Sequence, residues 1–332
     1  SYSPYYFELQ DFDQITGEYT LFALNPTNSG AYLGNISPYR NSDSQTRFEA
    51  RLNWDQTFGL HSIGAMTVFK MEDNELTSGN STSIYETLPE RNMGNSGRLT
   101  YDFDRRYFME FGYGYNGSEK FNGSQRYGFF PSIAIGWMVS NEKFWEKINE
   151  KFFSSLKLKA SIGKVGNDAI AGRAGRFFYL SSITTYGQTE ARNNGYRWGQ
   201  GFMNAYGGYS VLRYANPDIT WEASTKKNLG FELGLMKDAL KIQADFYNDD
   251  RKNIYMTREN FPATAGLEAD ISGNVGRVKS NGIDASADYQ HIFNKDLWLT
   301  GRANFTYAKN KYVEMDEKNY PDQYLKRLGH NI

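Results

Sequence analysis

Residues 179–214 bring aromatic side chains together with arginine and asparagine. Aromatic rings can stack on sugar rings or grip a peptide, and arginine and asparagine side chains hydrogen-bond hydroxyl groups and peptide groups. We therefore predict that this segment is a ligand-binding loop for an oligosaccharide or a peptide. The alternative is that the same rings pack the loop against itself or against a partner. The predicted binding residues are Tyr186, Tyr196, Arg197, Trp198, Tyr206 and Tyr209.

The chain lacks the residue sets of common catalytic and metal centres. It has no cysteine, its three histidines are far apart in the sequence, and neither HExxH nor GxSxG occurs. The glycine-rich run Gly163–Arg176 matches neither nucleotide-binding pattern and is interpreted as a flexible extracellular loop. Asp249 and Asp250 are potential Ca²⁺ ligands, although adjacent carboxylates at a strand end are more often solvated. We predict a protein that is not an enzyme and has no cofactor.

The composition restricts the class of protein. The 332 residues carry a formal net charge of -1, which gives no sign of nucleic-acid binding. No run of about 18 apolar residues is present, so a transmembrane helix is excluded. Strands of about 9–11 alternating residues can still cross a membrane.

The clearest structural pattern follows the segment NPDITWE at residues 216–222. In residues 228–235 every second side chain is apolar, from Leu229 to Leu235, and residues 240–247 repeat this alternation. A period of two indicates β-strands with one apolar and one polar face. The short turn between the two segments predicts an antiparallel hairpin.

The same pattern recurs along the chain and predicts about twelve strands, with one amphipathic helix at residues 141–153. Short turns alternate with long polar loops, among them residues 25–45 and 71–96. The predicted short turns are near Asp11, Thr57, Arg105, Lys237 and Lys295. Outer-membrane barrels have short periplasmic turns and long extracellular loops, whereas soluble sandwiches mix their loop lengths. The fold is therefore predicted to be all-β, an antiparallel transmembrane β-barrel, with residues 1–332 forming part of one barrel domain.

The polar positions of the predicted strands should face the lumen of such a barrel, where they would meet solute or other parts of the protein. These positions are Glu49, Arg51, Asn53, Glu110, Lys157, Lys159, Glu232, Lys241, Gln243, Asp245, Asp284, Asp288, Arg302 and Asn304.

Several segments together resemble one family. RYGFFPSIAIGWMVSNEKFW (126–145), LKLKASIGKVGND (156–168), NPDITWEASTKKNLGFELGL (216–235) and FPATAG with the later GNVGRVKSNGID are similar in order and spacing to motifs of the SusC/RagA family. These are TonB-dependent outer-membrane transporters of Bacteroidetes. Lys159, Ile162 and Asp284 depart from the residues usual in the family.

The resemblance implies an architecture larger than this chain. Complete members carry a signal peptide, an N-terminal domain, a TonB box, a plug and a barrel, and 22-stranded barrels with a plugged lumen are the known transporter form. The chain would then supply about twelve strands of a probable 22, without the plug, the N-terminal domain or the last strands.

The resemblance also implies a function and partners. It predicts TonB-dependent import of an oligomeric nutrient, glycan or peptide, together with a SusD-like surface lipoprotein. TonB would act through the missing N-terminal region, and outer-membrane lipid would surround the barrel. The sequence leaves two alternatives open: a soluble, lectin-like glycan-binding β protein and a passive porin.

Overall fold

The computed structural model describes residues 6–24, 41–78, 88–148, 152–170, 177, 179–185, 196–202 and 204–331. No helix within these residues is long and apolar enough to cross a membrane. The chain divides into two compact units, residues 1–44 with 75–87 and residues 45–74 with 88–332.

The first unit contains an antiparallel hairpin of β1 (Phe7–Phe12) and β2 (Tyr19–Ala23). Its turn is closed by a hydrogen bond from the Gly17 amide to the Asp13 carbonyl at 2.8 Å, and Gly17 has a φ of 74°. Residues other than glycine rarely adopt this conformation, so the glycine permits the turn. This hairpin contains the short turn predicted near Asp11, and it forms a sheet of its own.

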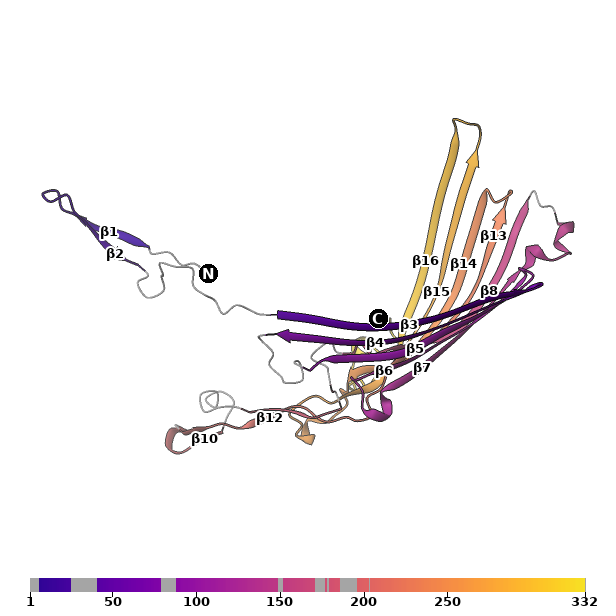
Figure 1. The fold of residues 1–332 in the computed structure, drawn as a ribbon. Helices are drawn as coiled ribbons and strands as arrows, with labels where there is room; N and C mark the ends of the chain where they lie inside the picture. Colours follow the sequence, from indigo (N-terminus) through magenta and orange to yellow (C-terminus); the bar gives the residue numbers. More distant parts are fainter. Residues whose placement is uncertain are drawn as a thin grey trace. The chain divides into compact units, whose positions relative to one another are not determined.

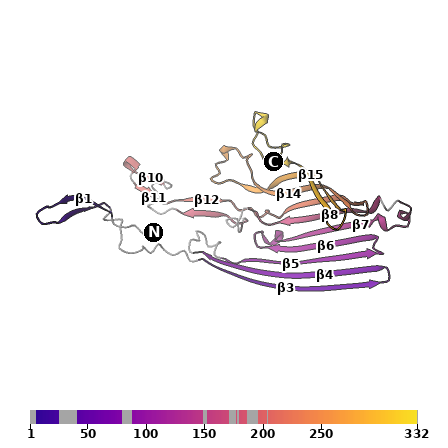
Figure 2. The same ribbon diagram turned by 90° about the horizontal axis from the view of Figure 1, so that it is seen from above.

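The second unit is built on a ten-stranded antiparallel sheet, to which β3 and β4 belong along with eight later strands (Figure 1). The order is β16-β15-β14-β13-β8-β7-β6-β5-β4-β3, so neighbours in sequence are neighbours in space except across the β8–β13 step. Figure 2 shows β3 to β8 side by side. The strands are β3 (Asn41–Phe58), β4 (His61–Ser78), β5 (Glu90–Phe103), β6 (Tyr107–Ser118), β7 (Tyr127–Met138), β8 (Phe153–Asn167), β13 (Glu222–Leu235), β14 (Leu240–Thr257), β15 (Ser272–Ile292) and β16 (Trp298–Glu314).

The shorter elements lie in the connections. The short strands are β9 (Ser182–Thr185), β10 (Tyr196–Trp198), β11 (Asn204–Tyr206) and β12 (Tyr209–Arg213). The 3-10 helices are η1 (Gly123–Gln125), η2 (Val139–Asn141), η3 (Trp145–Lys147), η5 (Gln200–Phe202), η6 (Ala263–Ala265) and η7 (Gln323–Leu325).

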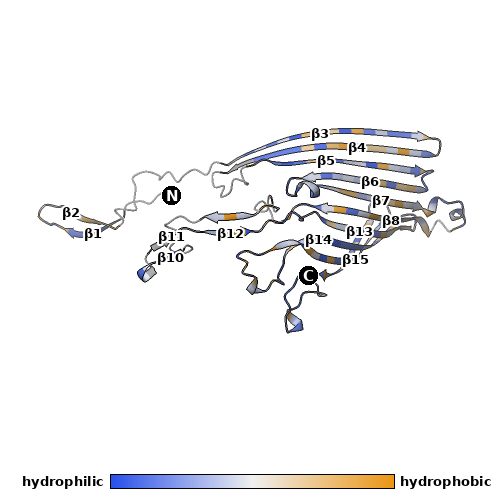
Figure 3. Cartoon of the chain, turned by 90° about the horizontal axis from the view of Figure 1, so that it is seen from below, coloured by the Kyte–Doolittle hydropathy of each residue, from blue (hydrophilic) through white to orange (hydrophobic). Residues whose placement is uncertain are grey.

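The register places the two kinds of side chain on opposite faces of the sheet. One cross-strand row consists of Ala160, Leu229, Phe246, Ile283 and Tyr307. We call the face that carries this row the outer face. The neighbouring row consists of Lys159, Gly230, Asp245, Asp284 and Thr306, and lies on the opposite, inner face. The alternation is visible along the strands in Figure 3.

Aromatic rings border the apolar part of the outer face at both ends. At the turn end, where short turns join β3–β4, β5–β6, β13–β14 and β15–β16, Tyr107 lies next to Phe103 and Trp137. At the opposite, loop end, Tyr115 stacks on Tyr127 with ring centroids 5.3 Å apart. Tyr107 and Tyr115 are on one strand, and the eight residue steps between them cover about 27 Å. This matches the apolar band of about 25 Å between two aromatic girdles that an outer-membrane barrel presents to lipid.

The strands extend further than their apolar pattern indicates. Residues 25–45 and 71–96 are predicted to be loops, but β3 begins at Asn41, β4 ends at Ser78 and β5 begins at Glu90. The backbone hydrogen bonds of a sheet do not require apolar side chains, so pairing continues beyond the apolar band.

The predicted helix at residues 141–153 is wrong. The described part of this segment holds the 3-10 turns η2 and η3, and β8 starts at Phe153. Glu142 lies next to the aromatic residues at the turn end. Its carboxylate accepts hydrogen bonds from the Tyr107 hydroxyl at 2.6 Å and the Trp137 indole at 3.1 Å. The segment is thus held by contacts with β6 and β7 that its own helical periodicity does not reveal.

Candidate functional site

The predicted ligand-binding residues lie in the long connection between β8 and β13. Tyr186 falls outside the described residues. The backbones of Tyr196 and Tyr206 are paired in the β10–β11 hairpin, in which Trp198 is opposite Asn204. Tyr209 begins β12 and pairs with Thr185 of β9 in a separate two-stranded sheet.

Three of the predicted residues present their side chains to solvent. Arg197 is exposed, and Trp198 and Tyr209 expose 63% and 61% of their surface. Solvent-exposed rings are available to stack on a ligand, so the geometry is compatible with the prediction. The β10–β11 hairpin and the β9–β12 pair are separate sheets, so the predicted binding residues occupy two structural elements rather than one surface.

The base of this connection is tied to the segment that follows β14. The Val211 amide donates to the Glu268 carboxylate at 2.7 Å, and the Glu268 amide donates to the Tyr214 hydroxyl at 3.1 Å. The guanidinium of Arg213 donates to the carbonyl of Leu180 at 3.1 Å. Tyr209 is therefore part of a strand whose position is fixed by hydrogen bonds to the segments that contain Glu268 and Leu180.

A buried cluster lies beneath these connections at the loop end. Phe121, Ile170, Ile219 and Trp221 are each at most 8% exposed, and Phe130 and Tyr255 pack against them. The Trp221 ring lies 5.1 Å from Phe121 and 5.3 Å from Phe130, measured between centroids. The sequence analysis placed Ile219 and Trp221 in the NPDITWE segment and Ile170 in the glycine-rich run, and it did not single out Phe121. The structure brings them together as the anchor of the long connections.

Hydrogen bonds surround this cluster. Asn274 accepts from the Thr220 amide at 2.9 Å and donates to the Thr220 carbonyl at 2.9 Å, so its side chain substitutes for a strand partner. Glu222 accepts from the Tyr255 amide at 3.1 Å and from the Asn167 amide group at 3.0 Å. The segment before β13 is consequently fixed to β8, β14 and β15 at once.

Paired charges cover the inner face further down the sheet. The Lys159 ammonium lies 3.0 Å from the Asp245 carboxylate and 3.5 Å from that of Glu232. These three residues were predicted to share a polar face, and the contacts confirm it. A recess of about 410 Å³ adjoins Lys159 and is also lined by Asp55, Thr100, Glu110 and Lys157. Charged groups of both signs in a wide recess suit contact with polar solute.

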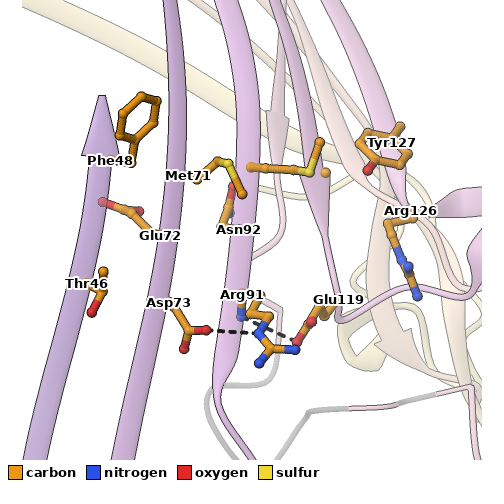
Figure 4. Close-up of a pocket in the computed structure, with 12 residues that line it drawn as sticks. Thr46, Phe48, Met71, Glu72, Asp73, Arg91, Asn92, Glu119, Arg126 and Tyr127 are labelled. Atoms are coloured by element: carbon orange, nitrogen blue, oxygen red, sulfur yellow. Dashed lines mark hydrogen bonds and ion pairs between the residues drawn. The ribbon is translucent and has the colours of Figure 1, made fainter. Parts of the chain in front are cut away.

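A second recess, of about 370 Å³, lies toward the loop end of β3–β7 (Figure 4). Phe48, Met71 and Tyr127 contribute apolar side chains to its lining. Arg91 crosses its polar part, where Nε donates to the Asp73 carboxylate at 2.9 Å and the backbone amide donates to Glu119 at 3.3 Å. The charge of Arg91 is thus compensated within the recess.

The two adjacent aspartates do not form a cation site. Asp249 accepts a hydrogen bond from Ser224, whereas Asp250 pairs with Arg277 through two contacts of 2.8 Å. Neighbouring residues of a strand point to opposite faces, so the two carboxylates cannot share one ion. No cluster of three or more metal-ligating side chains occurs among the described residues.

Comparison of the sequence with known families agrees with the ten-stranded sheet and its apolar band. Residues 2–329 match the family described as "TonB dependent receptor-like, beta-barrel". The chain belongs to this family. It is therefore part of an outer-membrane β-barrel, its outer face meets lipid, and its turn end is periplasmic.

Curated TonB-dependent receptors are similar over most of the chain. TonB-dependent receptor P3 of Formosa agariphila is 24% identical over 301 residues, which are 84% of this chain and 28% of that protein. TonB-dependent receptor SusC of Bacteroides thetaiotaomicron is 27% identical over 232 residues, 69% of this chain and 21% of that protein. The chain thus spans less than a third of the length of these relatives.

Solved structures of the family share the fold. The RagAB peptide importer in its "open-open" state superposes with a TM-score of 0.66 at 20% identity, covering 88% of this chain and 32% of that chain. Its "closed-closed" state gives a TM-score of 0.65 at 21% identity, covering 83% and 31%. The matching family is a class of receptors and transporters rather than a class of enzymes.

Proposed function

We propose that this chain forms the barrel wall and part of the extracellular mouth of a longer TonB-dependent importer of oligomeric nutrients. The observation that carries the proposal is the ten-stranded sheet, apolar on one face and lined with ion-paired side chains on the other, in a chain of the TonB-dependent receptor family. A barrel wall needs both faces: one for lipid and one for a polar path.

One similar structure supports a peptide as the cargo, because RagAB is a peptide importer. The resemblance of the sequence motifs to the SusC/RagA family adds an oligosaccharide as the alternative cargo and a SusD-like lipoprotein that covers the mouth. TonB engages a part of the longer protein outside this chain, where a plug and an N-terminal domain complete the transporter.

Arg197, Trp198 and Tyr209 are proposed to contact the cargo, together with Tyr186, Tyr196 and Tyr206. The exposure of Trp198 and Tyr209 supports this role, because a ring without a packing partner can offer its face to a sugar or a peptide group. The paired charges of Lys159, Asp245 and Glu232 would border the path further in.

Uptake in cells tests the energised import. The intact protein that contains this chain is expressed in the outer membrane, and uptake of labelled peptide and oligosaccharide pools is followed with and without a protonophore. Import that stops with the protonophore supports the proposal. Import that continues unchanged identifies a passive porin, and a protein recovered without detergent identifies the lectin-like alternative.

A second experiment tests whether the exposed rings of the extracellular mouth bind the cargo. The double variant Trp198→Ala/Tyr209→Ala is expected to weaken cargo binding by about 10-fold or more, because truncating a Trp or Tyr that anchors a ligand typically costs more than about 1 kcal/mol. The matched control is Phe305→Ala, which removes an exposed ring from the lipid-facing side. Equal binding by both variants would contradict the role of the loop. Detergent extracts also reveal by mass spectrometry whether a lipoprotein co-purifies.

A further inference from the structure

A group of basic side chains lies on the outer face of β13–β16, just beyond the apolar band toward the loop end. The last row of the band there contains Leu229, Phe246, Ile283 and Tyr307. The next three cross-strand rows toward the loop end carry mainly basic residues on the outer face. Asp250 and Glu314 are the acidic residues in these rows. The basic residues are Lys227, Lys252, Arg277, Lys279, Lys309 and Lys311.

The acidic residues compensate only part of this charge. The Arg277 guanidinium forms an ion pair with each of them, at 2.8 Å from the Asp250 carboxylate and 2.8 Å from the Glu314 carboxylate. Lys252 lies at the edge of the same group, 3.8 Å from Asp250. Among the described residues, Lys227, Lys309 and Lys311 form no ion pair.

The register gives Lys279 an acidic neighbour on one side and a basic neighbour on the other. Asp250 of β14 is directly opposite Lys279 and offsets part of its charge. Lys279 of β15 is directly opposite Lys311 of β16, and Lys309 follows on the same face two residues away. Like charges directly across a pair of strands destabilise the sheet. An anion held between the two ammonium groups would convert this repulsion into attraction, since an ammonium group donates strong hydrogen bonds to phosphate.

The position of the lysines along the strands indicates which kind of anion they bind. Lys309 is two residues beyond Tyr307 of the apolar band on the same face, a separation of about 7 Å along the strand. A charged group so close above a lipid-facing band is at the depth of lipid head groups, and lysine can reach outward with its aliphatic stem on the apolar surface. The continuity with the lipid-facing surface favours a lipid over a soluble anion.

We propose that the outer face of β13–β16 binds a phosphorylated lipid of the outer leaflet. Lys279, Lys309 and Lys311 hold its head-group phosphate, and the acyl chains lie on Ile283, Phe305 and Tyr307 below. Lys227 extends the basic surface across β13. The face of β3–β7 differs, because its outer-face arginine at the same end, Arg91, is already paired with Asp73.

Native mass spectrometry of the intact protein tests the proposal. The protein is extracted from outer membranes, reconstituted in phosphatidylcholine nanodiscs with and without bisphosphorylated lipid A, and released for lipid counting. The wild-type protein is expected to retain lipid A in preference to phosphatidylcholine. Retention should fall as salt is raised, because screening weakens contacts with exposed charges.

The test variant is Lys279→Gln/Lys309→Gln/Lys311→Gln. Each basic residue near an anionic lipid surface contributes about fivefold to binding, so the triple variant should bind lipid A about 100-fold more weakly. The matched control is Lys226→Gln/Arg251→Gln, which removes basic residues from the inner face of β13 and β14 near the same end. The control should retain lipid A like the wild type.

Two results would overturn the proposal. One is equal lipid A retention by the triple variant and the control, with no dependence on salt. The other is a second protein or a second copy of the chain on this face, detected as a cross-link through Lys309 or Lys311 that persists when lipid A is present. The salt dependence of the wild-type protein decides the matter even if the triple variant fails to fold.

Discussion

The two ends of the ten-stranded sheet are stabilised in different ways. At the turn end, strands that are adjacent in sequence are joined by tight turns, and the rings of Phe103, Tyr107 and Trp137 line up along three consecutive strands. At the loop end, Trp221 is buried against Phe121 and Phe130, about a hundred residues away in sequence, and donates a hydrogen bond to the Arg126 carbonyl at 3.3 Å. The turn end is formed by local pairing, whereas the loop end depends on contacts between distant segments.

This difference has a consequence for function. The loop end must hold long extracellular connections in place without lipid around them, so it uses a small buried core of its own. At the turn end most connections are short turns, and the longer β7–β8 connection buries Val139 and Trp145. Substitutions at the loop end should therefore disturb the extracellular segments, and those at the turn end should mainly affect the insertion depth of the barrel.

The largest effect is expected for Trp221→Ala. Truncating a buried aromatic side chain costs about 3–5 kcal/mol, and the cavity would loosen Ile170 and Ile219. Limited proteolysis of the intact protein in detergent should show faster cleavage within residues 168–221. Trp298→Ala serves as the control, because Trp298 at the turn end is 62% exposed. Equal cleavage rates for the two variants would contradict the proposed difference in how the loop end and the turn end are stabilised.

A smaller effect is expected for Asn274→Ala. The substitution removes the partners of the Thr220 amide and carbonyl, and each group left unpaired costs about 1–3 kcal/mol. Hydrogen exchange should rise at residues 218–222 while the β15–β16 ladder stays protected. Asn304→Ala, at an exposed inner-face position of β16, should leave this exchange unchanged. Protection of Thr220 in the Asn274 variant would contradict the assigned role.

The turn end should respond to pH through Glu142, which lies beyond the membrane-spanning part of β7. Hydrogen bonds from Tyr107 and Trp137, together with the charge of Arg106, lower the pKa of Glu142. A carboxylate whose pKa is lower in the folded state stabilises the fold above its unfolded pKa, and this contribution is lost as the pH falls through the folded pKa. Thermal unfolding of the intact protein should show a loss at acidic pH that Glu142→Gln reduces.

The smallest effect is expected for Tyr107→Phe. The variant keeps the ring in the girdle and removes only the hydroxyl that donates to Glu142 at 2.6 Å. The Trp137 indole and Arg106 still contact the carboxylate, so the melting temperature should fall less than in Glu142→Gln. A larger fall in Tyr107→Phe would mean that the ring itself, rather than the shared carboxylate, is displaced.

The sequence alone is sufficient to predict the strands of the large sheet, its antiparallel order and its two faces. Alternation of side chains such as Leu229 with Gly230 and Glu232 is a property of one strand, and short turns such as the one near Lys237 fix which strands are neighbours. Family motifs in these same segments predicted the membership that the comparisons confirm. The wrong helix at residues 141–153 arose where Glu142 uses distant partners.

Tertiary structure decided the features that depend on register and on distant contacts. That Lys279 faces Lys311, or that Lys159 meets Asp245 through the intervening β13, follows only from how residues of different strands align. The burial of Trp221 likewise requires the return of the chain after the long β8–β13 connection. Local periodicity carries the information for a strand, whereas a site made from several strands is specified by their pairing, which no single segment of the sequence contains.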